Sequence, residues 1–203
     1  MSPDLEQYIL NHIAPEPDHL ARLNRYTHLH HLYSHQCSGH LQGRLLAMLS
    51  GMISPRRILE LGTFTGYSAL CLAEGLHPNG ELHTVEHNDE DEETLTELFE
   101  SDSRIKLHIG DASTMIQQLP GPWDLVFIDA NKREYTQYLK LVLPKMTHGG
   151  YILADNTLWD GKVISPEAND AQTQGIREFN DLVSNMNTVI LPIRDGMTII
   201  KVQ

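Results

Sequence analysis

Cysteine is scarce in this sequence, and long apolar runs are missing. The two cysteines, Cys37 and Cys71, are too few for a disulfide framework, so we expect free thiols and a cytoplasmic protein. The longest apolar runs, such as the one ending at Ala73, are far too short to span a bilayer, and no membrane partner is expected. The N-terminus begins acidic and lacks the basic start and apolar stretch of a secretory signal.

Positive charge is also in short supply. Fifteen Lys and Arg residues stand against 27 Asp and Glu residues, which gives a net charge of −12. This balance favours solubility and disfavours a phosphate backbone or an anionic membrane as partner. A local basic patch is compatible with it, so nucleic acid is a disfavoured partner rather than an excluded one.

Histidine is abundant by contrast, with 12 residues, four of them between His28 and His35. On one continuous helix, His28, His31 and His35 would share a face. Two interpretations stay open for them. One is a zinc site. The other, which we favour, is a solvated or subunit-contact face, because neither a His-Glu-x-x-His pattern nor paired cysteines accompany these histidines.

The first 53 residues are predicted to be helical. Helices are expected over residues 4–13, from 17 to about 34, and over 41–52, with Pro15 and Pro17 separating the first two. Apolar residues in the third helix recur at helical spacing and predict one buried face. They are Leu41, Leu45, Met48, Leu49 and Met52.

From residue 56 onward, short apolar runs alternate with amphipathic stretches. Helices are expected over about 66–75, in the acidic stretch through Glu100, after Ala112, and up to about Leu143. Near-continuous apolar strands alternating with helices predict a parallel sheet covered on both faces. The expected strands are residues 57–61, 81–86, 105–109, 123–129 and 150–155.

The C-terminal end has a different pattern. Asp195-Gly196 lies between apolar runs over 188–193 and 197–202, which predicts an antiparallel hairpin. The expected fold class is therefore α/β, with a mostly parallel seven-stranded sheet that ends in this hairpin. We expect one domain over residues 1–203, in which residues 1–53 form a helical lid or dimer segment and residues 54–203 form the core.

The turn after the first strand indicates a binding site. Gly62 and Gly66 join a strand to a helix, and glycines there let the backbone approach a ligand closely. In an open parallel sheet such a site lies beyond the carboxyl ends of the strands. The dinucleotide fingerprint needs a glycine where this sequence has Phe64, so a nicotinamide oxidoreductase is disfavoured.

The ends of the second and third strands carry further candidates. Glu86 ends the second strand, where a carboxylate can accept hydrogen bonds from ribose hydroxyls. Asp111 and Ala112 follow the third strand, where a carboxylate and a backbone N–H can bind an adenine edge. Each of these features alone is weak, and the prediction depends on their coincidence at three successive strand ends.

Asp129, Asp155 and Asn156 follow the fourth and fifth strands. Two carboxylates and an amide oxygen suit a hard cation, for which Mg²⁺ fits best and Mn²⁺ or Ca²⁺ could substitute. The alternative is that Asp129 caps a helix and Asp155-Asn156 caps a turn. On spacing alone, the two interpretations stay equally open.

Lys132 lies at the start of a predicted helix, three residues after Asp129. A lysine there is unfavourable for the helix dipole, and such violations are enriched at functional sites. A neighbouring divalent cation would disfavour the charged form of its amine by repulsion, which is the property that a general base requires. The alternative is an exposed surface lysine.

Taken together, these segments resemble the cation-dependent, class I S-adenosylmethionine O-methyltransferases, in a bacterial form. This family includes the catechol and caffeoyl-CoA O-methyltransferases. The resemblance extends from about Ser38 to the C-terminus and implies the Rossmann-like fold of that class. The matching stretches are residues 58–70, 127–132 and 154–163.

The resemblance implies a role for each of these residues. Lys132 would be the general base, and Asp129, Asp155 and Asn156 would bind the metal ion, with Asp129 also acting in catalysis. Gln36, Lys132 and Trp159 would contact the substrate. The cofactor, S-adenosylmethionine, would be held by Ser38, Gly62, Thr63, Phe64, Gly66, Tyr67, Ser68, Glu86, Asp111, Ala112 and Asp129.

Two positions depart from the family pattern. The family usually has an aspartate at the position of Asn131, so the charge of the site differs here without loss of a ligand. At the position of Gln36 relatives often carry methionine, and a polar residue there changes the shape of the pocket.

The implied activity is metal-dependent methyl transfer to a hydroxyl of a catechol-like or caffeoyl-type aromatic compound. The substrate itself stays open. The alternatives are methylation of a hydroxylated uridine in tRNA, which a basic face built from Arg22, Arg25, Arg44, Arg56 and Arg57 would favour, and a non-catalytic S-adenosylmethionine-binding interaction protein. The helical N-terminus is expected to support a homodimer.

Overall fold

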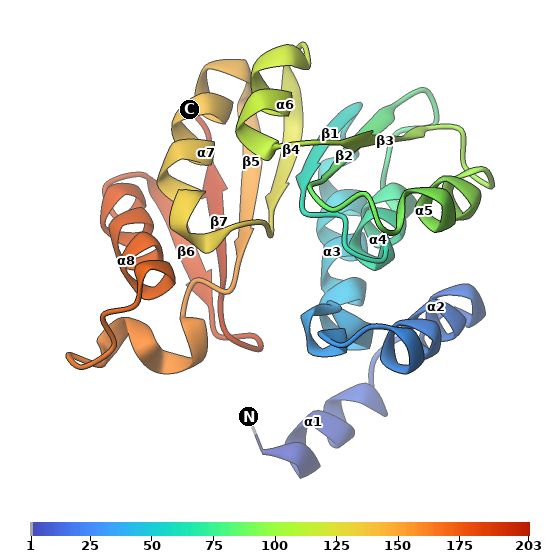
Figure 1. Ribbon diagram of the computed structural model, residues 1–203, viewed down its shortest axis with the longest axis horizontal. Coiled ribbons are helices and arrows are strands. Elements are labelled where there is room, and N and C mark those ends of the chain that lie inside the picture. Colours follow the sequence, from blue (N-terminus) through green and yellow to red (C-terminus); the bar gives the residue numbers. More distant parts are fainter. Residues whose placement is uncertain (1) are drawn as a thin grey trace.

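The computed structural model describes residues 2–203 and is built around one sheet (Figure 1). Its strands are β1 (Arg57–Leu61), β2 (Glu81–Glu86), β3 (Ile105–Ile109), β4 (Trp123–Ile128), β5 (Met146–Asp155), β6 (Asn187–Leu191) and β7 (Met197–Lys201). Its α-helices are α1 (Pro3–Leu10), α2 (Asp18–His30), α3 (Gly39–Ile53), α4 (Tyr67–Glu74), α5 (Glu92–Phe99), α6 (Ala112–Gln118), α7 (Tyr135–Val142) and α8 (Ala171–Val183). Short 3₁₀ segments are η1 (Ser34–Gln36), η2 (Lys132–Glu134), η3 (Leu143–Lys145) and η4 (Trp159–Ile164).

The sheet confirms the predicted fold class. Its seven strands lie in the order β3-β2-β1-β4-β5-β7-β6, and the pairs from β3 to β5 are all parallel. Strand β7 is antiparallel to both β5 and β6, so the C-terminal hairpin forms as its Asp-Gly signal predicted. All strands of the parallel part therefore end at one edge of the sheet, which is where a ligand site is expected.

Helices cover both faces of the sheet, and each face has its own apolar core. In strand β1, Leu59 and Leu61 belong to the core under α6, α7 and α8, whereas Ile58 belongs to the core under α3, α4 and α5. This alternation follows from the period of two in a strand. Both cores consist of fully buried side chains, which explains why the parallel strands read as continuous apolar runs.

The N-terminal helices differ from the prediction in two respects. Helix α2 ends at His30, because His31 is extended, so His28, His31 and His35 do not share a helical face. The ring of His31 instead meets the ring of Phe64 edge-on, with centroids 5.3 Å apart. In α3, Met48 and Met52 are largely exposed rather than buried. The buried face of that helix is formed by Gln42, Gly43, Leu46 and Ser50.

Helix α8 was not predicted, although the sequence carries signals for it. Asp170 caps its N-terminus by accepting a hydrogen bond from the backbone N–H of Thr173. Ile176, Phe179 and Val183 then recur at helical spacing and are buried against α7 and the sheet. Outside this stripe the composition of the helix is polar, so only a few apolar residues mark the helix in the sequence.

Two further sequence expectations concern thiols and membranes. Both cysteines, Cys37 and Cys71, are free and buried. Among residues 2–203, no helix has the length and apolar character needed to cross a membrane.

A buried carboxyl group lies in β1 beneath the first turn. Glu60 is completely buried, and its carboxyl accepts a hydrogen bond of 2.5 Å from the Thr84 hydroxyl. Thr84 in turn lies 2.5 Å from the hydroxyl of Thr63. Burial raises the pKa of Glu60 to about 8, and the Asp129 and Glu86 carboxylates act in the same direction. The group is therefore protonated in the folded protein at neutral pH.

Two neighbouring glycines at the α3–α4 contact should respond oppositely to alanine. A Cβ at Gly75 would overlap the backbone of Ser50 and Gly51, whereas a Cβ at Gly51 would meet open space. Gly75→Ala should lower the free energy of unfolding by about 1–3 kcal/mol, as overpacking does. Gly51→Ala, in the interior of α3, should raise it by roughly 0.5–1 kcal/mol. Urea unfolding measures both, and equal effects of the two substitutions would contradict this packing.

The raised pKa of Glu60 predicts a loss of stability with rising pH. The folded state keeps a proton that the unfolded chain releases near pH 4.5, so the contribution is complete below that pH and is lost as the pH rises through about 8. In this window Glu60 should contribute a slope of roughly −1 kcal/mol per pH unit. Glu60→Gln should remove that slope in urea unfolding with a chelator present. Glu93→Gln, an exposed control, should keep it, and an unchanged slope in Glu60→Gln would refute the assignment.

Candidate active site

A cavity of about 700 Å³ opens at the carboxyl ends of the parallel strands. It is bounded by the first turn, by the ends of β2 to β5, by η1 and by the β6–β7 turn. The sequence-predicted residues that line it are Gln36, Ser38, Gly62, Thr63, Phe64, Tyr67, Ser68, Glu86, Asp111, Ala112, Asp129, Lys132, Asn156 and Trp159. The fold thus brings together residues separated by up to 123 positions in the sequence.

Two predicted residues do not line this cavity. Gly66 has φ +85° and faces α5, because a Cβ there would meet the side chains of Leu98 and Phe99. Its structural contribution is therefore the left-handed turn that starts α4. Asp155 is only 3% exposed and lies just below the cavity, next to Asn156, which does line it.

The first turn is shaped by close packing of backbone against backbone. Gly62 has φ +100°, and a Cβ there would overlap the carbonyl of Asp129, so only glycine fits where the chain leaves β1 beside the end of β4. Phe64 also has positive φ, at +49°, and its backbone N–H donates to Glu86 Oε2 over 2.7 Å. The strand end of β2 thereby holds the turn in place.

The two acidic residues at the ends of β2 and β3 have different environments. Glu86 accepts from the Phe64 and Asn88 backbone N–H groups, at 2.7 and 2.9 Å, through different carboxylate oxygens. Asp111 caps helix α6 with Oδ1, which accepts from the N–H and hydroxyl of Thr114. These two bonds lower the pKa of Asp111, which is therefore a carboxylate at neutral pH.

Lys132 lies in η2 directly after β4 and is paired with Asp129. Its Nζ is 2.7 Å from Asp129 Oδ1, and both side chains are largely buried, with 13% and 18% exposure. The same ammonium lies 5.6 Å from the centroid of the Tyr135 ring. Lys132 is thus held inside the cavity rather than extended into solvent, in contrast to the surface-lysine alternative.

Asp155 is a buried carboxyl group among other acidic groups. Its Oδ2 accepts from Gln42 Nε2 over 2.7 Å, and its Oδ1 accepts from the Asn156 backbone N–H over 2.9 Å. Burial, together with the charges of Asp129 and Asp195, raises the pKa of Asp155 to about 7. The site therefore holds more negative charge than its protein environment neutralises.

Asn156 has a defined amide orientation. It adopts φ +58°, and its Nδ2 donates to both carboxylate oxygens of Asp195, at 2.8 and 2.9 Å. Because the NH₂ group is used in this way, the amide oxygen remains available on the cavity side. Asn156 thus combines a left-handed backbone conformation with two hydrogen bonds to a carboxylate, an arrangement that a simple turn cap does not need.

Sequence reasoning missed four residues that support this site. Tyr135 is completely buried, and its hydroxyl lies 3.1 Å from the carbonyl of Ile128 and 3.0 Å from that of Asp155, so it joins the ends of β4 and β5. The other three are Gln42, Arg194 and Asp195. Asp195 was predicted only as part of a turn, and nothing in the local sequence links residue 42 to residue 155.

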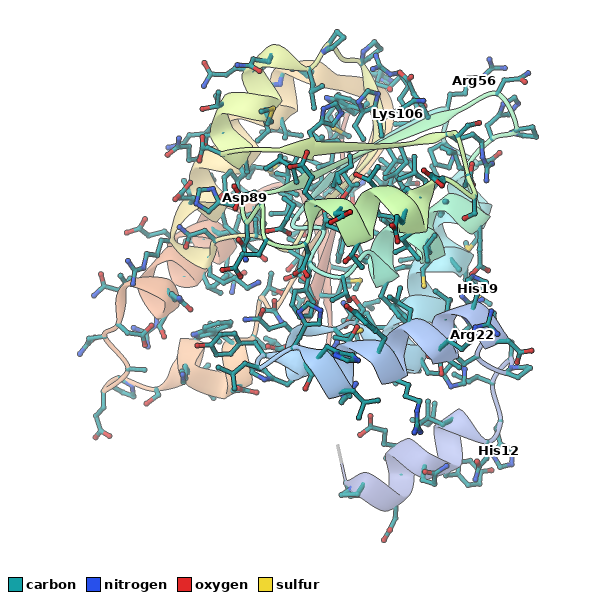
Figure 2. All side chains as sticks on the ribbon, turned by 45° about the vertical axis from the view of Figure 1, so that its right-hand side comes forward. His12, His19, Arg22, Arg56, Asp89 and Lys106 are labelled. Carbon is teal, nitrogen blue, oxygen red and sulfur yellow. The ribbon has the colours of Figure 1, made fainter. Side chains whose placement is uncertain are left out.

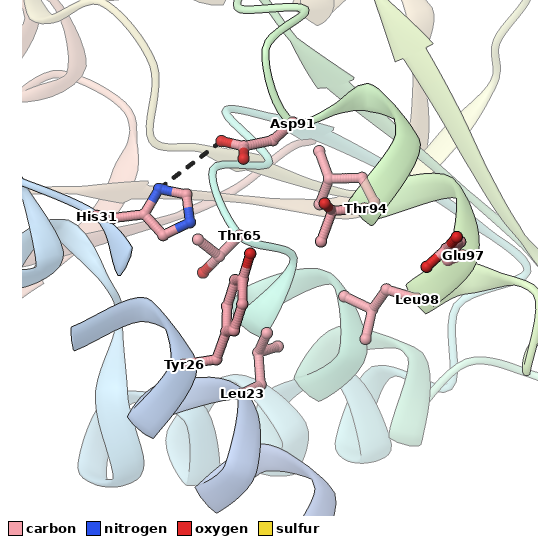
Figure 3. A pocket seen from close by; sticks show the side chains of 9 residues that line it. Leu23, Tyr26, His31, Thr65, Asp91, Thr94, Glu97 and Leu98 are labelled. Carbon is pink, nitrogen blue, oxygen red and sulfur yellow. Dashed lines mark ion pairs between the residues drawn. The ribbon is translucent and has the colours of Figure 1, made fainter. Parts of the chain in front are cut away.

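A second, smaller pocket of about 290 Å³ lies between α2 and α5 (Figure 3). Tyr26 and Leu23 line it from α2, and His31 faces Asp91 at its edge, with 3.7 Å between Nδ1 and Oδ2. The predicted zinc alternative is not supported here. Among residues 2–203, no third His, Cys, Asp or Glu side chain is grouped with His31 and Asp91 so as to hold a metal ion.

The chain is similar in sequence to known O-methyltransferases. A family model described as O-methyltransferase matches residues 10–203. A catechol O-methyltransferase of Niastella koreensis is 34% identical over 156 residues, which is 73% of this chain and 70% of the relative. A caffeoyl-CoA O-methyltransferase of Stellaria longipes is 30% identical over 216 residues, which is 97% of this chain and 89% of the relative.

Solved structures are similar over nearly the whole chain. The methyltransferase PaMTH1 of Podospora anserina, bound to SAH, has a TM-score of 0.90 at 29% identity, with 98% of this chain and 94% of that chain covered. An O-methyltransferase of Bacillus cereus in complex with SAH also has a TM-score of 0.90, at 27% identity, with 98% and 97% covered. By its matching family model and its curated relatives, this chain belongs to the O-methyltransferase family.

Proposed function

We propose that this enzyme transfers the methyl group of S-adenosylmethionine to a hydroxyl of a catechol-like or caffeoyl-type small molecule, and that the reaction depends on a divalent cation. One observation carries the proposal. A single cavity combines a glycine-containing turn beside Glu86 with a cluster of Asp129, Asn156 and Lys132, above the buried Asp155.

The cofactor is proposed to bind at the first turn. Glu86 is held by two backbone N–H groups, and its remaining lone pairs are suited to accept from two ribose hydroxyls. Asp111 Oδ2 and the Ala112 N–H are available for an adenine edge, because Asp111 caps α6 with its other oxygen. Ser38, Gly62, Thr63, Phe64, Tyr67, Ser68 and Asp129 line the rest of the path, and Gly66 shapes the turn. SAH or SAM is bound in similar structures, including TomG of Streptomyces achromogenes.

The residues at the ends of β4 and β5 fit a divalent cation. Asp129 and Asp155 place two carboxyl groups close enough to raise the pKa of Asp155, and the ammonium of Lys132 is paired with Asp129. The amide oxygen of Asn156 is left available by Asp195. Oxygen donors with excess negative charge match the preference of Mg²⁺, with Mn²⁺ or Ca²⁺ as substitutes. A cation bound there would lower the pKa of a substrate hydroxyl, which for a free phenol is about 10.

Lys132 is proposed to accept the proton of that hydroxyl as a neutral amine, because a cation bound beside it would disfavour its charged form. Its Nζ is fixed by Asp129 at 2.7 Å, so the amine is already positioned at the cavity wall. The same Asp129 would bind the cation and hold the base. These two contacts are the catalytic role that we propose for Asp129. The contribution of these residues is positioning and electrostatics, since the methyl donor supplies the reactive group.

Gln36 and Trp159 are proposed to wall the substrate pocket. Both line the cavity, Gln36 from the end of η1 and Trp159 from the start of η4. Trp159 has φ +48°, and its indole N–H is buried without a partner among residues 2–203. The named catechol and caffeoyl-CoA activities of the relatives support an aromatic hydroxyl compound.

The tRNA alternative receives less support from the structure. Arg44 is paired with Glu74, and Arg57 is paired with Glu81. In Figure 2 both Arg22 and Arg56 lie on the right-hand side of the view, with Arg56 near the top and Arg22 lower down, on α2. The non-catalytic alternative would leave the buried Lys132–Asp129 pair without a role.

A homodimer in the cytoplasm is proposed as the working state. Met48 and Met52 expose 67% and 77% of their surface on α3, and Val189 exposes 51% on β6. Exposed apolar side chains of this size are favourable at subunit contacts. The two free thiols agree with a reducing compartment.

Magnesium dependence is the first test. The purified protein should transfer labelled methyl groups from S-adenosylmethionine to caffeate or a simple catechol in the presence of Mg²⁺. Chelation should abolish transfer, and added Mg²⁺ should restore it. Transfer that is unaffected by chelator would refute metal dependence. Transfer only to tRNA bearing hydroxyuridine would replace the small-molecule proposal.

Lys132→Ala should lower turnover by roughly two orders of magnitude, because a general base contributes about 10²–10⁴-fold. The affinity for S-adenosylhomocysteine, measured by calorimetry, should stay within about threefold, since Lys132 is not proposed to hold the cofactor. Lys140→Ala, an exposed lysine on α7, is the matched control and should retain full turnover. Unchanged turnover in Lys132→Ala would reject the base assignment.

A further inference from the structure

The turn between β6 and β7 contains a strained residue. Arg194 has φ +49°, in the left-handed region that favours glycine and that a long side chain rarely adopts. The next residues are Asp195 and Gly196, and Gly196 also has positive φ. Such a conformation persists only where the surrounding structure stabilises it. The contacts of the Arg194 side chain therefore indicate which function requires it.

The guanidinium of Arg194 joins the turn to a segment more than 150 residues earlier. Its Nη1 donates to the carbonyls of Cys37 and Ser38, at 2.9 and 2.7 Å, and to Gln42 Oε1 at 3.0 Å. Its Nη2 donates to the carbonyl of His35 at 2.9 Å. The fork of one arginine thus satisfies four acceptors, which a lysine with a point charge could not do in this geometry.

Gln42 carries this contact to the acidic cluster. It is completely buried in α3, and its Nε2 donates to Asp155 Oδ2 over 2.7 Å. Both ends of the amide are therefore used, with the oxygen toward Arg194 and the nitrogen toward Asp155. A reversed amide would set its oxygen against a carboxylate, so the bond from Arg194 selects the orientation in which Gln42 supports Asp155.

We propose that Arg194 is a positioning residue for the cation site: through Gln42 it fixes the carboxylate of Asp155, and its loss weakens the binding of a divalent cation. This inference rests on the proposed metal dependence. Arg194 itself is no ligand and acts only through the buried amide. The neighbouring residue Asp195 orients Asn156 in the same way, because its carboxylate accepts two hydrogen bonds from the Asn156 amide.

The physical reason is the repulsion within the acidic cluster. Asp155 is only 3% exposed, and the nearby carboxylates of Asp129 and Asp195 repel its carboxyl group. A hydrogen bond from a fixed amide counters this repulsion and keeps the oxygen in one place. Partners that orient metal ligands typically contribute about 10–100-fold to metal affinity.

The test is a Mn²⁺ titration of the cofactor-free protein. The electron paramagnetic resonance signal of free Mn²⁺ reports how much of the ion remains unbound. Arg194→Ala keeps a Cβ and so leaves the backbone strain unchanged, while it removes all four hydrogen bonds. We expect it to weaken Mn²⁺ binding by about tenfold, and Gln42→Met, which fills a similar volume without hydrogen bonding, by at least as much. The double variant should bind no more weakly than Gln42→Met, because the two residues act in series.

Arg56→Ala is the matched control, since Arg56 is exposed and its side chain makes no hydrogen bond or ion pair among residues 2–203. It should bind Mn²⁺ within twofold of the wild type. Circular dichroism and S-adenosylhomocysteine affinity check that each variant is folded. If Arg194→Ala is not folded, Arg194→Lys is used, which keeps the charge but loses the fork, and a loss of about threefold or more is expected.

The outcomes separate the two claims. A wild-type protein that does not bind Mn²⁺ overturns the metal proposal and this inference with it. If the wild type binds Mn²⁺ and Arg194→Ala binds within twofold of it, the inference alone is overturned. Additive losses in the double variant likewise overturn it, because Arg194 would then act independently of Gln42.

Discussion

The burial of Asp155 among other acidic groups is the constraint on which the site depends. A carboxyl group that is 3% exposed, with Asp129 and Asp195 nearby, is costly in its charged form, which is why its pKa is raised to about 7. The surrounding structure supplies a hydrogen bond to each of its oxygens, from Gln42 and from the Asn156 backbone. The remaining excess of negative charge is what makes the cluster suited to a cation.

This constraint explains why the N-terminal helices and the C-terminal hairpin meet. Gln42 comes from α3, and Arg194 comes from the β6–β7 turn, yet one hydrogen-bonded chain joins them to the end of β5. The same guanidinium binds the carbonyls of residues 35, 37 and 38, which lie in a wall of the cavity. The part of the chain that encloses the ligand site is therefore attached to the part that carries the acidic cluster.

The cofactor side of the cavity has a simpler physical basis. Parallel strands end at one edge, so the first turn and the ends of β2 and β3 are brought together by topology alone. The turn is then positioned by backbone contacts, such as the close approach of Gly62 to the carbonyl of Asp129 and the hydrogen bond from the Phe64 N–H to Glu86. This half of the site needs few long-range side-chain contacts, whereas the acidic half needs several.

The sequence by itself determined the sheet, its order of elements, the hairpin and the residues at the strand ends, because periodicity and turn chemistry are local properties. It also indicated which carboxylates and which lysine would gather at one edge. It did not determine that α2 ends at His30 or that Met48 and Met52 are exposed. Those outcomes depend on which surfaces meet. Only the tertiary structure decided the roles of Gln42, Tyr135, Arg194 and Asp195, because their partners lie 7 to 159 residues away and no local pattern encodes such contacts.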